Sequence, residues 1–181
     1  MAACRVAHVS PLKADCGAVD DDIAFDVTLD VAEPLKDDVN VRCVYVVDAS
    51  QPERDLELES LDVGNNPGVP QGVLKFTLQA PPPSRDVLEQ GPGSLEVTVV
   101  YLSALYRGKE FCRVGYYVRH EYTDPAMQEE PPEIVAWEKL RRVLSEPCIT
   151  HFPIAWDDRP AAVADEAGPP PVAAPGAAAA G

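Results

Sequence analysis

The chain has 181 residues, with 15 Lys and Arg against 30 Asp and Glu, which gives a formal net charge of −15 at neutral pH. This length predicts one domain with a hydrophobic core of its own and a short tail. The acidic balance argues against direct binding to nucleic acid, which needs a basic surface, and favours basic partners. The same acidity is also compatible with a charge that only keeps the protein in solution.

The five cysteines are odd in number and scattered, and no C-x-x-C motif occurs among Cys4, Cys16, Cys43, Cys112 and Cys148. This pattern predicts reduced thiols in an intracellular protein rather than a disulfide framework. Because three of them alternate with apolar neighbours, we expect them to serve as small buried apolar residues.

The three histidines, His8, His120 and His151, lack the spacing to one another, to Cys or to Asp that a metal site requires. We therefore expect no metal and no cofactor. The first twenty positions contain acidic and polar residues, which argues against a signal peptide, and no apolar run approaches the length of a membrane span. We expect a soluble intracellular protein without membrane contact.

In the first half of the chain, the clearest strand is residues 23–31, where apolar and polar residues alternate strictly. Further strands are predicted at 3–9, 39–48 and 73–79, with a less regular apolar stretch at 55–63. Asp37 and Asp38 form an acidic corner, and 64–72 is a turn-rich loop.

In the second half, the pattern predicts a loop at 84–94, a strand at 95–106 and a hairpin turn at 107–108 leading into a strand at 110–122. A short helical turn is expected through residue 130. Residues 133–144 fit an amphipathic helix that presents Ile134, Trp137, Leu140 and Leu144, and 148–156 is a last strand.

About eight short strands with a single short helix predict an all-β protein built as a β-sandwich. We place this domain at residues 1–158. Residues 159–181 consist mainly of Ala, Pro and Gly and cannot build a core, so we expect a disordered tail.

The strand at 110–122 has an unusual outer face. Alternation places Cys112, Val114, Tyr116 and Val118 on one face and Phe111, Arg113, Gly115, Tyr117 and Arg119 on the other. Arg and Tyr dominate the binding energy of many interfaces. A solvated strand with an ordinary cross-strand pair would show the same pattern.

The neighbouring strand at 95–106 places Val97, Val99 and Tyr101 on one face. If that face is exposed beside Arg113 and Tyr117, it forms an apolar stripe rimmed by charge, which suits a helix from a partner. A loop or the 134–144 segment could instead cover the stripe, and periodicity leaves both possibilities open.

The last strand offers a second feature. If residues 148–152 form an edge strand, an extended peptide from a partner can pair with it. A paired or merely short edge is the alternative.

An enzymatic function lacks support in the sequence. Cys112 and His120 would lie roughly 26 Å apart along one extended strand, and Cys148 and His151 fall on opposite faces. The Gly64–Gly72 loop lacks the Lys and Ser or Thr of a phosphate-binding loop. We expect a protein that is not an enzyme.

Several short segments resemble, in order, the anti-silencing-function histone chaperone family. They are Tyr106–Phe111, Arg113–Val118, Glu121–Thr123, Pro131–Pro132, Lys139–Arg142, Ile149–Phe152 and Ile154–Asp157. Weaker matches occur in the first half, at Asp37–Asp38, Val44–Val46, Asp55, Val63–Gly64 and Phe76. The resemblance covers about residues 3–158.

The resemblance implies an immunoglobulin-like sandwich that acts as a monomeric, nuclear and also cytoplasmic histone chaperone. It would bind the histone H3–H4 dimer, block H3–H4 tetramer formation and hand the histones to chromatin assembly factors for nucleosome assembly and disassembly. HIRA-type and chromatin-assembly-factor B-domain peptides would be further partners, and the excess of acidic over basic residues in positions 1–60, 14 against 5, would steer such basic peptides.

The same resemblance assigns site residues in three groups. The expected H3-binding residues are Asp55, Val97, Val99, Tyr101, Arg113 and Tyr117. The expected H4-binding residues are Tyr116, Cys148, Ile149 and Thr150. The expected residues for assembly-factor peptides are Asp37, Asp38, Leu61, Val63 and Phe76.

Three positions depart from the usual family pattern. Tyr101 stands where the family usually has Leu, Cys148 where it often has Arg, and Gly93 where it often has Asp. The last two changes each remove a polar contact. The alternative function is a non-histone β-sandwich scaffold that binds peptides by strand addition.

Overall fold

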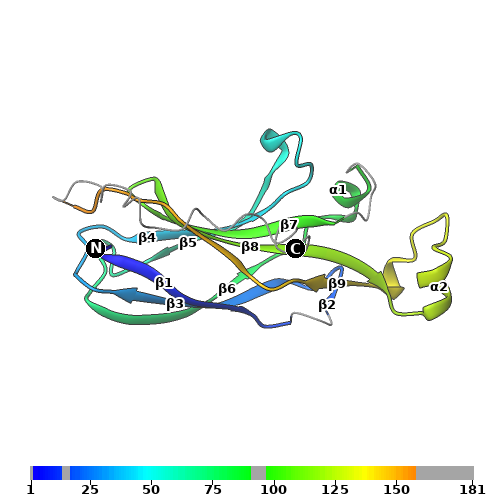
Figure 1. Cartoon of the computed structure of the whole chain (residues 1–181), viewed down its shortest axis with the longest axis horizontal. Coiled ribbons are helices and arrows are strands. Elements are labelled where there is room, and N and C mark those ends of the chain that lie inside the picture. The colour runs from blue at the N-terminus through cyan, green and yellow to red at the C-terminus, as the bar shows by residue number, and fades with distance from the viewer. Residues whose placement is uncertain (1, 14–16, 91–96, 158–181) are drawn as a thin grey trace, which may run out of the picture.

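The computed structural model describes residues 2–13, 17–90 and 97–157, which fold into two antiparallel sheets packed face to face (Figure 1). The strands are β1 (Cys4–Pro11), β2 (Gly17–Ala18), β3 (Ile23–Val31), β4 (Val39–Tyr45), β5 (Leu56–Val63), β6 (Gly72–Ala80), β7 (Thr98–Tyr106), β8 (Lys109–Tyr122), β9 (Leu140–Leu144) and β10 (Cys148–His151). This architecture confirms the predicted all-β sandwich.

The two sheets differ in size. The smaller sheet has the order β1-β3-β6, and the seven-stranded sheet has the order β2-β9-β8-β7-β4-β5, with β10 also paired to β8. Strand β8 is the longest and carries both β9 and β10 along one side, while β7 lies on its other side. The short helices α1 (Arg85–Gln90) and α2 (Pro125–Glu129) lie toward one end of the sandwich (Figure 1).

The core lies between the sheets and follows from period-2 alternation. The predicted inward faces of 23–31 and of 112–118 are buried, and Phe25 stacks on Tyr116 with ring centroids 5.2 Å apart. Phe111 was expected on the outer face but is buried, because Trp156 packs against its ring at 5.0 Å.

The hairpin that joins β7 to β8 turns as predicted at Arg107 and Gly108, which have φ of 51° and 76°. Positive φ at both positions is the requirement of a type I′ turn, which favours Gly at the second of them. A β-bulge beside the turn shifts the register: Ala104 pairs with Cys112 and Leu105 with Glu110, which leaves Phe111 of β8 as the extra residue.

The prediction of an amphipathic helix for residues 133–144 is wrong. The structure forms a 3-10 turn at Trp137–Lys139 and then strand β9. Leu140 and Leu144 are four residues apart, a spacing that fits a helix face but also places both on one face of a strand. Pairing with β8 decides between the two, since β9 covers the edge that Val118–Tyr122 would otherwise expose.

Smaller differences have local causes. The predicted loop at 84–94 contains α1, and the last strand ends at His151 rather than 156. The stretch predicted at 55–63 forms strand β5 over Leu56–Val63, and a bulge opposite Cys43 and Val44 accounts for its irregular apolar spacing.

Cys4, Cys43 and Cys112 are buried free thiols, as expected, and burial raises the pKa of each to about 12. Cys16, Gly93 and the tail predicted at 159–181 lie outside the described residues. Within the described ranges, the structure has no helix long and apolar enough to cross a membrane.

Candidate functional site

The outer face of the seven-stranded sheet carries a hollow of about 450 Å³, called the outer hollow here. Its lining comprises Val46, Asp48, Ala49, Pro52, Asp55, Val99, Tyr101, Arg113, Gly115, Tyr116, Tyr117, Cys148 and Thr150. The floor comes from paired positions of β7 and β8, where Val99 faces Tyr117 and Tyr101 faces Gly115. No residue of 134–144 belongs to this lining, so that segment leaves the stripe open.

One wall of the outer hollow is the segment between β4 and β5, which stands away from the sheet (Figure 1). Asp48 stiffens this wall by accepting hydrogen bonds from the Ser50 amide at 2.9 Å, the Ser50 hydroxyl at 2.6 Å and Gln51 Nε2 at 3.0 Å. These bonds, led by those from Ser50, lower the pKa of Asp48. The wall therefore holds a fixed shape around a carboxylate that stays ionised.

Asp55 ends this wall after the Pro52–Arg54 turn, and its amide donates to Pro52 O at 3.1 Å. Its Oδ1 atom is buried and has no hydrogen-bond partner among the described residues. Burial raises the pKa of Asp55, although the positive charge of Arg113 acts in the opposite direction. A buried acceptor without a donor is costly, which makes it a natural contact for a donor from a partner.

Arg113 is held from several sides. Its Nε and Nη2 donate to the two carboxylate oxygens of Glu110 at 2.6 and 2.7 Å. Its guanidinium lies over the Tyr101 ring at 4.5 Å and near the Phe152 ring at 5.9 Å. The hydrogen bonds from Arg113 to Glu110 are the main cause that raises the arginine's pKa.

Glu110 and Phe152 were not identified from the sequence. Glu110 precedes Arg113 by three positions, which strict alternation places on the opposite face. The bulge beside Leu105 breaks that alternation and lets the two side chains meet. Phe152 reaches Arg113 because β10 folds back along β8 and Phe152 N donates to Phe111 O at 2.9 Å.

The expected H4-binding residues lie on and beside β10. Cys148 and Thr150 point to the outer hollow, while Ile149 is 40% exposed. Within the described residues β10 pairs only with β8, so its other edge is open. The Tyr116 side chain is fully buried against Phe25, which leaves only its main chain at the hollow.

Val97 stands apart from the other predicted H3-binding residues. It immediately precedes β7, is 59% exposed, and is not among the residues that line the outer hollow. Its position extends the apolar surface of Val99 beyond the hollow along the same chain segment.

The expected assembly-factor residues occupy a different part of the molecule. Leu61 and Val63 lie on β5, an edge of the larger sheet, and Phe76 lies on β6, an edge of the smaller one. Leu61 is 37% exposed, and Val63 and Phe76 are partly buried against the core. These three apolar residues therefore lie on the neighbouring edge strands of the two sheets, and the surface that they form is called the seam here.

The two acidic residues beside this seam have different roles. Asp37 forms an ion pair with Arg107, which also contacts Asp157 at 3.1 Å. Asp38 instead accepts from the amides of Asn66 at 3.2 Å and Gly68 at 2.8 Å, which fixes the loop after β5. The Asp37 side chain is 47% exposed and can be reached by a partner despite its ion pair, whereas Asp38 holds the loop.

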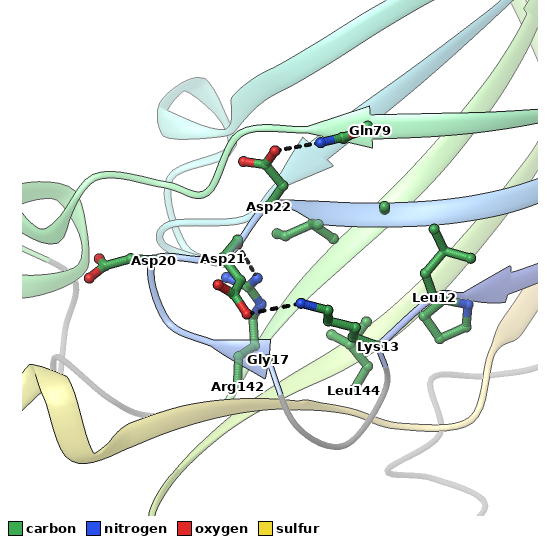
Figure 2. A pocket seen from close by; sticks show the side chains of 12 residues that line it. Leu12, Lys13, Gly17, Asp20, Asp21, Asp22, Gln79, Arg142 and Leu144 are labelled. Atoms are coloured by element: carbon green, nitrogen blue, oxygen red, sulfur yellow. Dashed lines mark hydrogen bonds and ion pairs between the residues drawn. The ribbon is translucent and has the colours of Figure 1, made fainter.

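A second hollow, of about 480 Å³, lies at the end of the sandwich near the β2–β3 turn and is called the end hollow here (Figure 2). Arg142 lies in its wall, only 5% exposed, and donates to Val19 O at 3.1 Å and Asp21 O at 2.6 Å. Asp21 and Asp22 have partners too, since Lys13 lies 3.4 Å from Asp21 and Gln79 donates to Asp22 at 2.6 Å. This arrangement clamps the turn to β9.

Across residues 2–13, 17–90 and 97–157, no group of His, Cys, Asp and Glu is arranged to hold a metal ion. The chemistry of the outer hollow is that of recognition: an apolar floor, one cationic group, one orphan carboxylate oxygen and an open strand edge. These are the elements of a protein–protein interface.

Comparison with known proteins gives a consistent result. A family model described as ASF1-like histone chaperone matches residues 1–157. The chain is 42% identical over 135 residues to "Histone chaperone asf1" of Drosophila melanogaster, covering 74% of this chain and 60% of the relative. It is 38% identical over 138 residues to "Histone chaperone ASF1B" of Mus musculus, covering 75% of this chain and 66% of the relative.

A third relative, "Histone chaperone ASF1" of Candida glabrata, is 42% identical over 142 residues, which cover 76% of this chain and 45% of the relative. The chain therefore spans about half to two thirds of the length of these curated relatives. Since the family model covers almost the whole described structure, the chain belongs to the ASF1-like histone chaperone family.

Proposed function

We propose that this chain is a histone chaperone that binds the H3–H4 dimer through the outer hollow. The observation that carries the proposal is the composition of that hollow, which combines apolar Val99, cationic Arg113 and the unpartnered oxygen of Asp55. An α-helix of H3 presents both apolar and charged side chains, and such a helix suits a shallow apolar groove with polar groups at its margin. The surrounding acidic chain, with net charge −15, attracts the basic histones.

Strand addition at β10 would engage H4. The open edge of Cys148–His151 offers backbone donors and acceptors to an extended segment, and exposed Ile149 offers an apolar contact beside it. Backbone pairing supplies affinity in this mode, while the flanking side chains supply selectivity.

Coverage of the H3 helices would exclude a second H3–H4 dimer and so block formation of the tetramer. Release to an assembly factor then requires only that the factor offer a stronger or larger interface, since every contact at the outer hollow is non-covalent and reversible. We place this activity in the nucleus, where nucleosomes are assembled and disassembled, and also in the cytoplasm, with the protein acting as a monomer.

The seam between β5 and β6 would bind the basic B-domain peptides of HIRA-type and chromatin-assembly-factor partners. Leu61, Val63 and Phe76 supply its apolar surface, and Asp37 supplies the charge. Because Arg107 already pairs with Asp37, a basic side chain of the peptide must compete with this internal arginine or share the carboxylate with it.

The seam assignment is tested with Asp37→Lys, measured by calorimetric titration of a basic B-domain peptide. We expect affinity to fall by about tenfold or more, because an attractive contact becomes repulsive. Arg107→Gln is the matched variant, and we expect it to bind the peptide at least as tightly as the wild type. Equal weakening by both variants would show that the Asp37–Arg107 pair matters only for the fold.

The H3–H4 assignment is tested by chemical cross-linking of recombinant H3–H4 with and without the chain. We expect stoichiometric chain to remove the cross-linked tetramer and leave dimer. Capture from nuclear extract addresses the alternative of a non-histone peptide scaffold: histones H3 and H4 as the dominant bound proteins support the chaperone, and their absence supports the scaffold.

A further inference from the structure

Tyr101 occupies the floor of the outer hollow in a position where its ring meets a charge rather than another apolar group. It faces Gly115 across the β7–β8 pair. Gly115 has no side chain to pair with Tyr101, and the Tyr101 ring lies under the guanidinium of the diagonal neighbour Arg113 at 4.5 Å.

Only some of the N–H donors of the Arg113 guanidinium are used within the described structure. Nε and Nη2 are directed to Glu110 at 2.6 and 2.7 Å, while Nη1 has no hydrogen-bond partner among the described residues. The guanidinium carbon lies over the Tyr101 ring, 4.5 Å from its centroid, and 5.9 Å from the centroid of the Phe152 ring. An arginine side chain restrained in this way has lost much of its rotamer freedom before any partner arrives.

Such restraint has an energetic consequence for binding. Ordering a long side chain at an interface costs about 0.5–1.5 kcal/mol, and that cost is removed when the free protein already holds the bound geometry. A leucine at position 101 could pack beneath the arginine stem but has no negatively polarised ring face to hold the guanidinium. The tyrosine at position 101 therefore affects how Arg113 is presented, as well as the volume of the pocket.

We propose that Tyr101 is a positioning residue that, together with Glu110, fixes the Arg113 guanidinium with its free Nη1 edge toward the outer hollow, ready for a carboxylate of the histone partner. This inference rests on the proposed function of the outer hollow. Asp55 lines the same hollow, near enough to Arg113 for their charges to interact, and would take a donor from the same partner. The hollow would therefore select a segment with an acidic group and a donor group on one face.

The binding test compares the wild type, Tyr101→Leu and Tyr101→Phe by fluorescence anisotropy with labelled recombinant H3–H4 at moderate salt. Loss of a partly exposed cation–π contact predicts a weakening of about two- to fivefold for Tyr101→Leu. Tyr101→Phe keeps the ring and is expected to bind like the wild type. Equal or tighter binding by Tyr101→Leu overturns the proposal.

The same pair of variants in an Arg113→Gln background separates positioning from direct packing. If Tyr101 acts through Arg113, the penalty of Tyr101→Leu disappears when the guanidinium is absent. If the penalty persists at full size, the ring contacts the histone directly and the positioning role is wrong.

A second readout needs no histone. The Nε–Hε signal of Arg113 in ¹⁵N NMR spectra, assigned by its loss in Arg113→Gln, should be shifted by the ring and slow to exchange in the wild type and in Tyr101→Phe. It should move toward the free-arginine position in Tyr101→Leu. An unchanged signal in Tyr101→Leu overturns the inference even if the histones bind, whereas a ring-dependent signal in a chain that does not bind H3–H4 overturns the proposed function alone.

Discussion

Two hollows of nearly equal volume, about 450 and 480 Å³, carry an arginine in their walls, yet the two arginines serve different purposes. In the end hollow (Figure 2), Arg142 is 5% exposed. It donates to the backbone carbonyls of Val19 and Asp21. In the outer hollow, the Arg113 side chain is 43% exposed and leaves Nη1 unused among the described residues.

The carboxylates show the same contrast. Around the end hollow, Asp20 pairs with Arg85, Asp21 with Lys13 and Asp22 with Gln79. At the outer hollow, Asp55 keeps a buried oxygen without a partner. Volume and an arginine therefore do not identify a binding site. What distinguishes the two is whether the polar groups are satisfied within the chain or still require a partner.

The largest expected effect follows from placing a charge on the apolar floor of the outer hollow. Val99→Arg should weaken H3–H4 binding by about a hundredfold or more, because an unpaired cation would be desolvated at the interface. Val73→Arg is the matched control, since Val73 is 61% exposed on the other sheet, and it should bind as the wild type does. Isothermal titration measures both, and equal affinity for Val99→Arg would remove the outer hollow as the histone site.

Mutation at the end hollow should lower the stability of the fold and leave histone binding unchanged. Arg142→Met removes two charge-assisted bonds to carbonyls and should lower the free energy of unfolding by about 3 kcal/mol, as measured in urea. Histone affinity of the folded protein should stay at the wild-type value. A variant as stable as the wild type would contradict the role of Arg142 as a structural clamp.

The free energy of unfolding should depend on pH through His120, a buried histidine near Arg142. Burial, together with the charge of Arg142, lowers the pKa of His120 to about 4, and its Nδ1 has no partner among the described residues. Between the ordinary pKa of histidine and pH 4, the unfolded chain binds a proton that the folded chain does not, so stability falls as the pH falls. This group should account for about 2 kcal/mol of lost stability between pH 7 and pH 5.

His120→Gln isolates that contribution, because all other titrating groups remain. Urea unfolding of the variant at pH 7 and pH 5 should show a stability loss smaller than that of the wild type. Identical losses in the two proteins would show that His120 is accessible to protons in the folded state.

The smallest effect concerns Gly115 in the floor of the outer hollow. A Cβ there would lie 3.9 Å from Cys148 O and 3.9 Å from Val99 Cγ1, which is ordinary contact. Gly115→Ala should therefore stabilise the fold by about 0.5 kcal/mol through the unfolded chain. Because the methyl group fills part of the hollow, histone affinity should fall by about twofold. A folding defect in thermal unfolding would show that the position is tighter than the structure indicates.

The sequence predicts which residues share the floor of the outer hollow, and the structure shows that this face is uncovered. Alternation in 98–106 and 112–118 correctly separates Val99 and Tyr101 from buried Val100 and Leu102, because the hairpin turn at Arg107–Gly108 fixes which strands pair. The sandwich class followed from the same period-2 signal.

The remaining parts of the hollow depend on long-range packing that periodicity does not encode. Glu110 reaches Arg113 only because of a bulge, and the wall at Asp48–Asp55 is shaped by hydrogen bonds within an irregular segment. Residues 133–144 have a spacing compatible with helix and strand alike, and pairing with β8 decides for the strand. The clamp at Arg142 joins positions more than a hundred residues apart.

The most direct test of the account is sedimentation velocity of the chain mixed with recombinant H3–H4 at moderate salt, with Val99→Arg and Val73→Arg run in parallel. We expect a complex of one chain with one H3–H4 dimer for the wild type and Val73→Arg, and free H3–H4 tetramer with Val99→Arg. A wild-type mixture in which the histones remain tetrameric and unbound, or a complex that Val99→Arg leaves intact, would contradict it.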